Sequence, residues 1–239
     1  MNWILDKPIA HRGLHRGTII PENSLLAFQA AIDLQLPIEL DVQHLADGNV
    51  VVFHDKTLDR MTQASGQISE KTIEDLRDIY LGDSTQKIPL LSEVLELIQG
   101  QVPLLIEVKN EGKVGKLEIQ LLKQLKVYSG AFAIQSFNPY VLAYCKQQIP
   151  HVLRGQLASQ FKNIGLSWYN KFLLSHLFYT GISDPHFIAY NIQDLPHCAP
   201  TIARRFFKKP LIAWTIRSDA DKQKAVRYAD NIIFDPYSD

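Results

Sequence analysis

The feature that most constrains the fold of this chain is a repeated alternation between short apolar runs and helix-like segments. Eight runs have the length and composition of buried strands: PIA (8–10), PIELDV (37–42), VPLLIEVK (102–109), AFAIQS (131–136), HVLRGQL (151–157), HFIAYN (186–191), PLIAWTI (210–216) and NIIFD (231–235). Amphipathic stretches between them predict helices: SLLAFQAAIDL (24–34), SEVLELIQG (92–100), VGKLEIQLLKQL (114–125), PYVLAYCKQQ (139–148) and DADKQKAVRYA (219–229). Asn23 or Ser24 is expected to cap the first helix, and Ser92 and Gly100 to bound the second.

Eight strands with intervening helices in 239 residues predict a (β/α)₈ TIM barrel. A doubly wound open sheet is the alternative. No G-x-G-x-x-G motif follows the first strand, which disfavours a dinucleotide-binding version of that sheet. Without an internal repeat or a Gly/Ser-rich linker, the simplest organisation is one domain over residues 1–239.

One segment departs from the parallel alternation. Asp47-Gly48 separates two β-rich runs, which predicts a hairpin with a two-residue turn. In that register, the numbers of any two residues that face each other across the hairpin add up to 95, so Asp41 would lie opposite His54. Residues 55–89 would then form a small insertion before the next barrel helix.

Acidic and basic side chains follow the predicted strands at a spacing of two. Glu39 and Asp41 share one side of the second strand, and Glu107 and Lys109 repeat the pattern on the third. Three carboxylates gathered in a partly buried site need a compensating cation, either nearby basic side chains or a metal ion. A donor set made only of oxygen favours Mg²⁺ or Ca²⁺.

The tripeptide HRG occurs twice, at residues 11–13 and 15–17. Catalytic groups of a barrel lie at the carboxyl ends of its strands, and His11 and Arg12 directly follow the first strand. His15 lies farther along in a loop, so the first HRG tripeptide is predicted to be the catalytic one. With His54, His11 would provide the acid and the base for hydrolysis of a phosphodiester, and the residues alone leave open which is which.

The motifs of the chain resemble those of glycerophosphodiester phosphodiesterases, in the same order and over about residues 8–236. The motifs are IAHRG, PENS, AFQAAIDL, IELDV, DGNVVVFHDKTLDRMT, LLIEVK, QSFNP and AWTI. The resemblance implies a (β/α)₈ barrel with a small insertion, and hydrolysis of glycerophosphodiesters to glycerol 3-phosphate and an alcohol.

The resemblance also implies roles for individual residues. It makes Glu39, Asp41 and Glu107 the metal ligands and His11 and His54 the acid–base pair. It places Arg12 and Lys109 on the phosphate, Glu22 and Asn23 beneath the first loop, and Trp214 in the glycerol pocket.

Four positions depart from the usual family pattern: Ser24, Leu45, Arg217 and the final IIFDPYSD. None of them replaces a proposed metal ligand or histidine. They bear on the identity of the substrate, since Arg217 directly follows the AWTI motif.

Two other functions remain open. A phosphodiesterase acting on lysophospholipids would use the same residues, and a non-catalytic barrel would bind phosphorylated ligands without turnover. The segment 164–182 bears on the first alternative. Its later half predicts a helix that buries one face, while Trp168, Tyr169 and Lys171 are candidates for contact with a lipid interface or an acyl chain.

Composition excludes several classes of partner and location. The formal net charge of +0 gives no bulk attraction to nucleic acid or to an anionic membrane. The resemblance implies a small molecule, a glycerophosphodiester, as the partner. Cys145 and Cys198 lack the spacing of a zinc site or a disulfide scaffold and are expected to be buried thiols. With no signal-like leader, a cytoplasmic location is expected.

Overall fold

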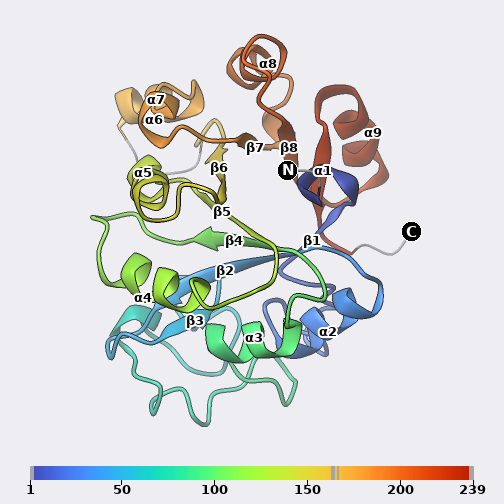
Figure 1. Cartoon of the computed structure of the whole chain (residues 1–239). Helices are drawn as coiled ribbons and strands as arrows, with labels where there is room; N and C mark the ends of the chain where they lie inside the picture. The colour runs from blue at the N-terminus through green and yellow to red at the C-terminus, as the bar shows by residue number, and fades with distance from the viewer. Residues whose placement is uncertain (1–2, 163–164, 166, 237–239) are drawn as a thin grey trace. The chain divides into compact units, whose positions relative to one another are not determined.

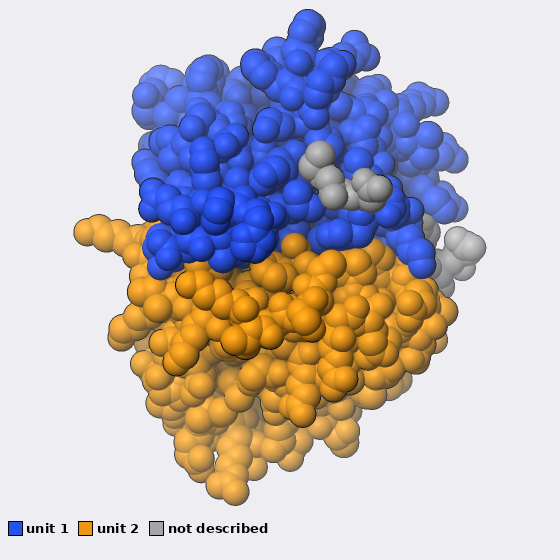
Figure 2. Space-filling model, in the orientation of Figure 1, with its two compact units in different colours: residues 1–8, 133–239 blue, residues 9–132 orange. Residues whose placement is uncertain are grey.

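The computed structural model describes residues 3–162, 165 and 167–236. It divides the chain into two compact units, which Figure 2 shows in different colours. The N-terminal unit comprises residues 9–132, and the C-terminal unit comprises residues 1–8 and 133–239. Both units consist of parallel strands alternating with helices.

The N-terminal unit contains a sheet of three parallel strands and one antiparallel strand. The strands are β1 (Ile9–His11), β2 (Ile38–His44), β3 (Val50–Val52) and β4 (Leu104–Val108). The helices are α2 (Leu25–Asp33), η1 (Ile68–Glu70), α3 (Leu91–Ile98) and α4 (Lys116–Leu125). Strand β2 pairs in parallel with both β1 and β4, and β3 pairs antiparallel with it (Figure 1).

The C-terminal unit contains five parallel strands in sequential order, β5 to β9. They are β5 (Phe132–Ser136), β6 (Leu153–Ala158), β7 (Phe187–Asn191), β8 (Leu211–Ile216) and β9 (Asn231–Phe234). The helices are α1 (Trp3–Asp6), α5 (Pro139–Gln148), α6 (Trp168–Ser175), α7 (Thr180–Ser183), η2 (Ile192–Asp194), α8 (Cys198–Arg205) and α9 (Asp219–Tyr228). All eight predicted parallel strands are therefore present in the described part of the chain.

Two helices begin at residues whose side chains accept backbone N–H groups of the first turn or of the cap. Ser24 caps α2 because its hydroxyl accepts the Ala27 N–H, at 3.2 Å. Ser92 does not cap α3, contrary to the prediction. The Glu93 carboxylate accepts the Leu90 N–H instead, at 2.7 Å, and the helix begins one residue before Ser92.

The hairpin of β2 and β3 has a different register from the predicted one. Val42 lies opposite Val52, so the numbers of two facing residues add up to 94 and not to 95. The Phe53 N–H donates to the Asp41 carbonyl oxygen at 3.0 Å, so Phe53, and not His54, adjoins Asp41. His54 therefore lies just beyond the paired part of the hairpin.

The reason for the shift is a turn of three residues instead of two. Leu45 donates its N–H to the Asn49 carbonyl at 2.8 Å, which leaves residues 46–48 in the turn. Gly48 has a φ of 88°, the left-handed conformation that closes a three-residue hairpin loop. The dipeptide Asp-Gly identified the hairpin correctly but not the length of its loop.

The excursion that follows the hairpin packs its own apolar side chains against it. The buried cluster consists of Leu45, Val51, Phe53, Leu58, Ile68, Leu76, Leu81 and Ile88. These residues come from the hairpin and from residues 55–89, which otherwise contain only turns, isolated bridges and η1. This packing holds the segment just after β3, which carries His54, against the sheet.

Candidate active site

Strands β2 and β4 bring three carboxylates together. Asp41 lies directly opposite Glu107 in the parallel register, and Glu39 is two residues earlier on the same side of β2. All three side chains are buried. One oxygen atom of each lies within 4.8 Å of those of the other two. We call these residues the carboxylate cluster.

The carboxylate cluster holds more negative charge than its environment favours. Burial raises the pKa of Glu39 well above its ordinary value, and the neighbouring carboxylates raise it further. Burial raises the pKa of Glu107 as well. Burial opposes ionisation of Asp41 too, but Lys109 and Arg12 outweigh it and hold the pKa of that carboxyl well below its usual range. Within the cluster, Asp41 is therefore the carboxyl most readily ionised, and added positive charge would favour ionisation of the other two.

This donor set fits a hard divalent cation. The Oδ1 atom of Asp41 is buried and accepts no hydrogen bond from the described residues. Every donor in the cluster is a carboxylate oxygen, the ligand type that Mg²⁺ and Ca²⁺ prefer. A bound cation would satisfy the Asp41 oxygen and favour ionisation of Glu39 and Glu107.

Two basic side chains adjoin the cluster. Arg12 donates its backbone N–H to Glu39 Oε2 at 3.1 Å, and its Nε lies 3.2 Å from Asp41 Oδ2. Lys109 donates from Nζ to Glu107 Oε1 at 2.9 Å and lies 3.6 Å from Asp41 Oδ1. Burial opposes the charge on both groups, but the carboxylates raise the pKa of each above its ordinary value. Both side chains therefore stay cationic beside the cluster.

Asn23 and Glu22 contact Arg12 in the first loop. Asn23 donates from Nδ2 to Asp41 Oδ2 at 2.9 Å and from its backbone N–H to the Arg12 carbonyl at 3.0 Å. Glu22 accepts from Nη1 of Arg12 at 2.6 Å. The loop that carries the first HRG is thus tied directly to a cluster carboxylate.

The two predicted catalytic histidines lie in the same unit as the cluster. His11 ends β1 opposite Glu39 and is buried. Both His11 and His54 are close enough to Asp41 to lower the pKa of its carboxyl. The predicted convergence of residues from three separate strands is therefore present in the N-terminal unit.

Asp55 sets the tautomer of the neutral His54 ring. Its Nδ1 lies 2.6 Å from Asp55 Oδ1, so Nδ1 carries the hydrogen and Nε2 keeps a lone pair in the neutral ring. Burial lowers the pKa of His54, which favours the neutral ring. Gln43 donates from Nε2 to the carbonyls of Phe53 and Asp55, at 2.9 and 2.8 Å, and fixes the backbone on both sides of His54.

Sequence reasoning missed two residues that join these parts. Arg60 donates to both oxygens of Asp55 and to both oxygens of Glu22. It thereby connects the carboxylate that orients His54 with the carboxylate that holds Arg12. Asp55 was recognisable as the immediate neighbour of His54, but Arg60 lies in an irregular segment where no spacing rule indicates its contacts.

Two further residues singled out in the sequence are His15 and Trp214. His15 is half-buried in the turns after β1, and one of its ring nitrogens lies within 4.8 Å of a ring nitrogen of His11. Trp214 belongs to the C-terminal unit, where its ring contacts Phe137 edge-on with centroids 5.6 Å apart. The Nε1 atom of Trp214 is buried and has no hydrogen-bond partner among the described residues. Its place in a substrate pocket remains a prediction.

A second group of metal-ligating side chains, in the C-terminal unit, has a less suitable donor set. His176, His197 and Cys198 offer atoms within 4.8 Å of one another. The Ala199 N–H donates to Nδ1 of His197 at 3.3 Å, which places the hydrogen of the neutral ring on Nε2. Binding a metal would require this helix cap to break. Cys198 is exposed, which corrects the expectation of two buried thiols, whereas Cys145 is buried as predicted.

None of the helices in the described ranges is both long enough and apolar enough to span a membrane.

Comparisons with known proteins agree with this arrangement. Residues 11–229 match the glycerophosphoryl diester phosphodiesterase family. A glycerophosphodiester phosphodiesterase from Caldanaerobacter subterraneus is 36% identical over 161 residues, which are 62% of this chain and 65% of that relative. The chain therefore spans slightly less than two thirds of the length of that relative.

Solved structures extend the likeness to the whole fold. A phosphodiesterase from Oleispira antarctica, in complex with the product sn-glycerol-3-phosphate, superposes with a TM-score of 0.80 at 23% identity and covers 97% of this chain and 93% of its own. A glycerophosphodiester phosphodiesterase from Thermotoga maritima gives a TM-score of 0.72 at 24% identity, with 95% and 92% covered. The predicted (β/α)₈ barrel is confirmed. With the match over residues 11–229, the chain belongs to the glycerophosphoryl diester phosphodiesterase family.

Proposed function

We propose that this protein hydrolyses glycerophosphodiesters to sn-glycerol 3-phosphate and an alcohol, in a reaction that requires a divalent metal ion. The observation that carries the proposal is the buried cluster of Glu39, Asp41 and Glu107, bordered by two cations. Family membership and the product held by the Oleispira antarctica relative support the choice of substrate. Together, residues 1–239 would act as one barrel domain, with 55–89 as its insertion.

The three carboxylates would hold Mg²⁺ or Ca²⁺ through their oxygens. When bound, the ion supplies positive charge that neutralises the phosphoryl oxygens of the substrate. Arg12 and Lys109 would donate hydrogen bonds to the same phosphate group, since both stay cationic. Trp214 would contact the glycerol part of the substrate.

The two histidines would transfer the protons. We assign the base to His54 because its Nδ1 faces Asp55 and its lowered pKa leaves Nε2 able to accept a proton from the attacking hydroxyl or water. His11 would donate a proton to the departing alcohol oxygen. Asp55 would stabilise the imidazolium that forms on His54, and Arg60 holds Asp55 in position.

The proposal is tested by identifying the products of glycerophosphocholine and glycerophosphoethanolamine by ³¹P nuclear magnetic resonance, with and without chelator. We expect sn-glycerol 3-phosphate only where the metal is available. A non-catalytic barrel would bind these compounds without releasing a product. Binding without turnover in the presence of either metal would therefore overturn the assignment as an enzyme.

A second substrate class is favoured by a specific observation. Trp168 is 79% exposed, at the first position of α6. An exposed tryptophan beside Tyr169 and Lys171 suits contact with a lipid interface or an acyl chain, so lysophospholipids are the alternative substrates. Trp168→Ser should lower turnover of lysophosphatidylcholine and spare glycerophosphocholine. Equal loss on both would show that the residue serves the fold, and no lysophospholipid turnover by the parent would remove the alternative.

A further inference from the structure

The C-terminal unit exposes a set of aromatic side chains on and around α6 and α8. We call them the aromatic band: Trp168, Tyr169, Phe172, Phe178, Phe206 and Phe207. Every exposed phenylalanine or tryptophan within the described residues belongs to this band. Exposed apolar residues scattered singly need no explanation, but large aromatic residues gathered in one region indicate an interaction surface.

Ring contacts join the part of the band on and just after α6 into two pairs. The rings of Trp168 and Tyr169 have centroids 6.0 Å apart, and those of Phe172 and Phe178 are 5.6 Å apart. The later half of this segment was predicted to bury one face. Leu177 is buried accordingly, but Phe178 is 61% exposed, so the burial is incomplete.

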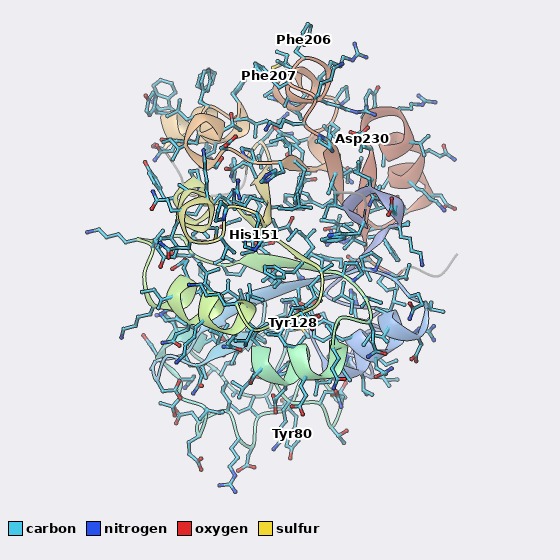
Figure 3. The ribbon with its side chains drawn as sticks, in the orientation of Figure 1. Tyr80, Tyr128, His151, Phe206, Phe207 and Asp230 are labelled. Carbon is cyan, nitrogen blue, oxygen red and sulfur yellow. The ribbon has the colours of Figure 1, made fainter. Side chains whose placement is uncertain are left out.

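The other part of the band lies at the end of α8. His176, next to Phe172, contacts the ring of His197 at the start of α8, with centroids 5.0 Å apart. Phe206 and Phe207 follow the last turn of this helix and are 77% and 69% exposed. Figure 1 shows α6, α7 and α8 along one margin of the C-terminal unit, and Figure 3 shows Phe206 pointing away from the ribbon.

Basic residues accompany the aromatic band. Residues 161–210 contain six basic side chains and two acidic ones, a net charge of +4 in a chain whose formal net charge is +0. Arg205 and Lys208 are exposed and directly flank the two phenylalanines. Lys162 and Arg204 form ion pairs with Asp194 and Asp230, so the positive charge beside the exposed aromatic side chains comes from Lys171 on α6 and from Arg205 and Lys208 at the end of α8.

We propose that the aromatic band binds the surface of a membrane that contains anionic phospholipids. Aromatic side chains partition into the boundary between headgroups and acyl chains, and Lys and Arg near them are attracted to anionic headgroups. The concentration of positive charge favours such a surface over a second copy of this chain, which would bring like charges together. The proposal concerns binding alone and does not depend on the proposed hydrolysis.

Co-sedimentation with vesicles tests the proposal. We compare vesicles of phosphatidylcholine with vesicles that also contain phosphatidylglycerol. The wild-type protein should bind the mixed vesicles more tightly, and the double variant Phe206→Ser, Phe207→Ser should lower its partition coefficient by roughly tenfold or more. Val226→Ser is the matched control, because Val226 is 79% exposed but lies on α9, outside the band. It should bind as the wild type does.

A charge variant separates the two contributions. Arg205→Gln with Lys208→Gln should weaken binding to the mixed vesicles at low salt and leave the weak binding to pure phosphatidylcholine unchanged. The same measurements provide the results that would overturn the proposal. One is a wild-type protein that stays in the supernatant with both vesicle types. The other is a wild-type dimer in size-exclusion chromatography that the phenylalanine variant converts to a monomer, which would make the band a surface for self-association.

Discussion

The carboxylate cluster and the aromatic band both depart from the usual distribution of side chains, the first by burying charged groups and the second by exposing apolar ones. In the cluster, three acidic groups are buried where most proteins place apolar ones. In the band, phenylalanine and tryptophan are exposed where most proteins place polar ones. The cluster carboxylates form hydrogen bonds and ion pairs with their neighbours, whereas side chains of the band contact one another through their rings.

The difference teaches that the two regions serve different kinds of partner. Added positive charge favours ionisation of buried carboxylates whose pKa values are raised, so the cluster suits a cation. The two basic side chains beside the cluster suit a phosphate. Exposed rings gain by removal of apolar surface from water, so the band suits an apolar or interfacial partner. Neither arrangement is needed to fold a barrel, and variants in the two regions should therefore have different effects.

The largest expected effect concerns the histidines beside the cluster. His11→Ala and His54→Ala should each lower turnover by roughly 10²–10⁴-fold, the usual contribution of a general acid or base. His15→Ala tests the second HRG. A ring nitrogen of His15 lies within 4.8 Å of one of His11, but His15 follows the strand end in the turns beyond β1, so its loss should have little effect. Steady-state kinetics on glycerophosphocholine checks all three variants. A His15→Ala variant as damaged as His11→Ala would contradict the choice of tripeptide.

A smaller effect is expected from the residue that joins Glu22 to Asp55. Arg60→Gln should lower turnover by roughly tenfold, because the carboxylates that orient Arg12 and His54 lose the donor that they share. Arg77→Gln is the matched control, since among the described residues the Arg77 side chain pairs with the exposed Glu74 alone, at 3.1 Å. Equal kinetics for the two variants would show that Arg60 has no part in positioning.

Removing a charge from the cluster should stabilise the metal-free protein, even though it should lower the activity. Because burial raises the pKa of Glu39, its ionisation destabilises the metal-free fold. This cost is absent below the ordinary pKa of 4.5 and is present once the pH exceeds the raised value. Glu39→Gln should therefore raise the Tm of the metal-free protein near neutral pH, by roughly 2–4 °C for each kcal/mol regained. Differential scanning calorimetry in chelator checks this, and an unchanged or lower Tm would contradict it.

The smallest expected effect concerns the aromatic band. Trp168→Ser should change the free energy of unfolding by no more than about 0.5 kcal/mol, as at other exposed positions without buried contacts. Urea unfolding measures it. A loss of several kcal/mol would mean that the tryptophan is part of the core, and the contrast between the two regions would no longer hold.

Much of this could be predicted from the sequence because strand order and spacing carry the information. Glu39, Asp41 and Glu107 follow from a period of two on parallel strands, and each strand began within two residues of its predicted position. The hairpin register was wrong by one because the sequence does not distinguish a two-residue turn from one closed by Gly48. The contacts of Arg60 depend on the path of an irregular segment, and the exposure of Phe178 depends on how far α6 packs against its neighbours. No local pattern determines either.

The central claim is that the cluster of Glu39, Asp41 and Glu107 binds a divalent ion needed for turnover. The most direct test measures metal content and product release together, for the wild-type protein and for Glu107→Gln, with chelator and after addition of Mg²⁺ or Ca²⁺. We expect the wild type to lose activity with its metal and to regain it on addition. Glu107→Gln, which removes charge but little volume, should remain folded and inactive throughout. Full activity of the wild-type protein in excess chelator, with no metal bound, would contradict the claim.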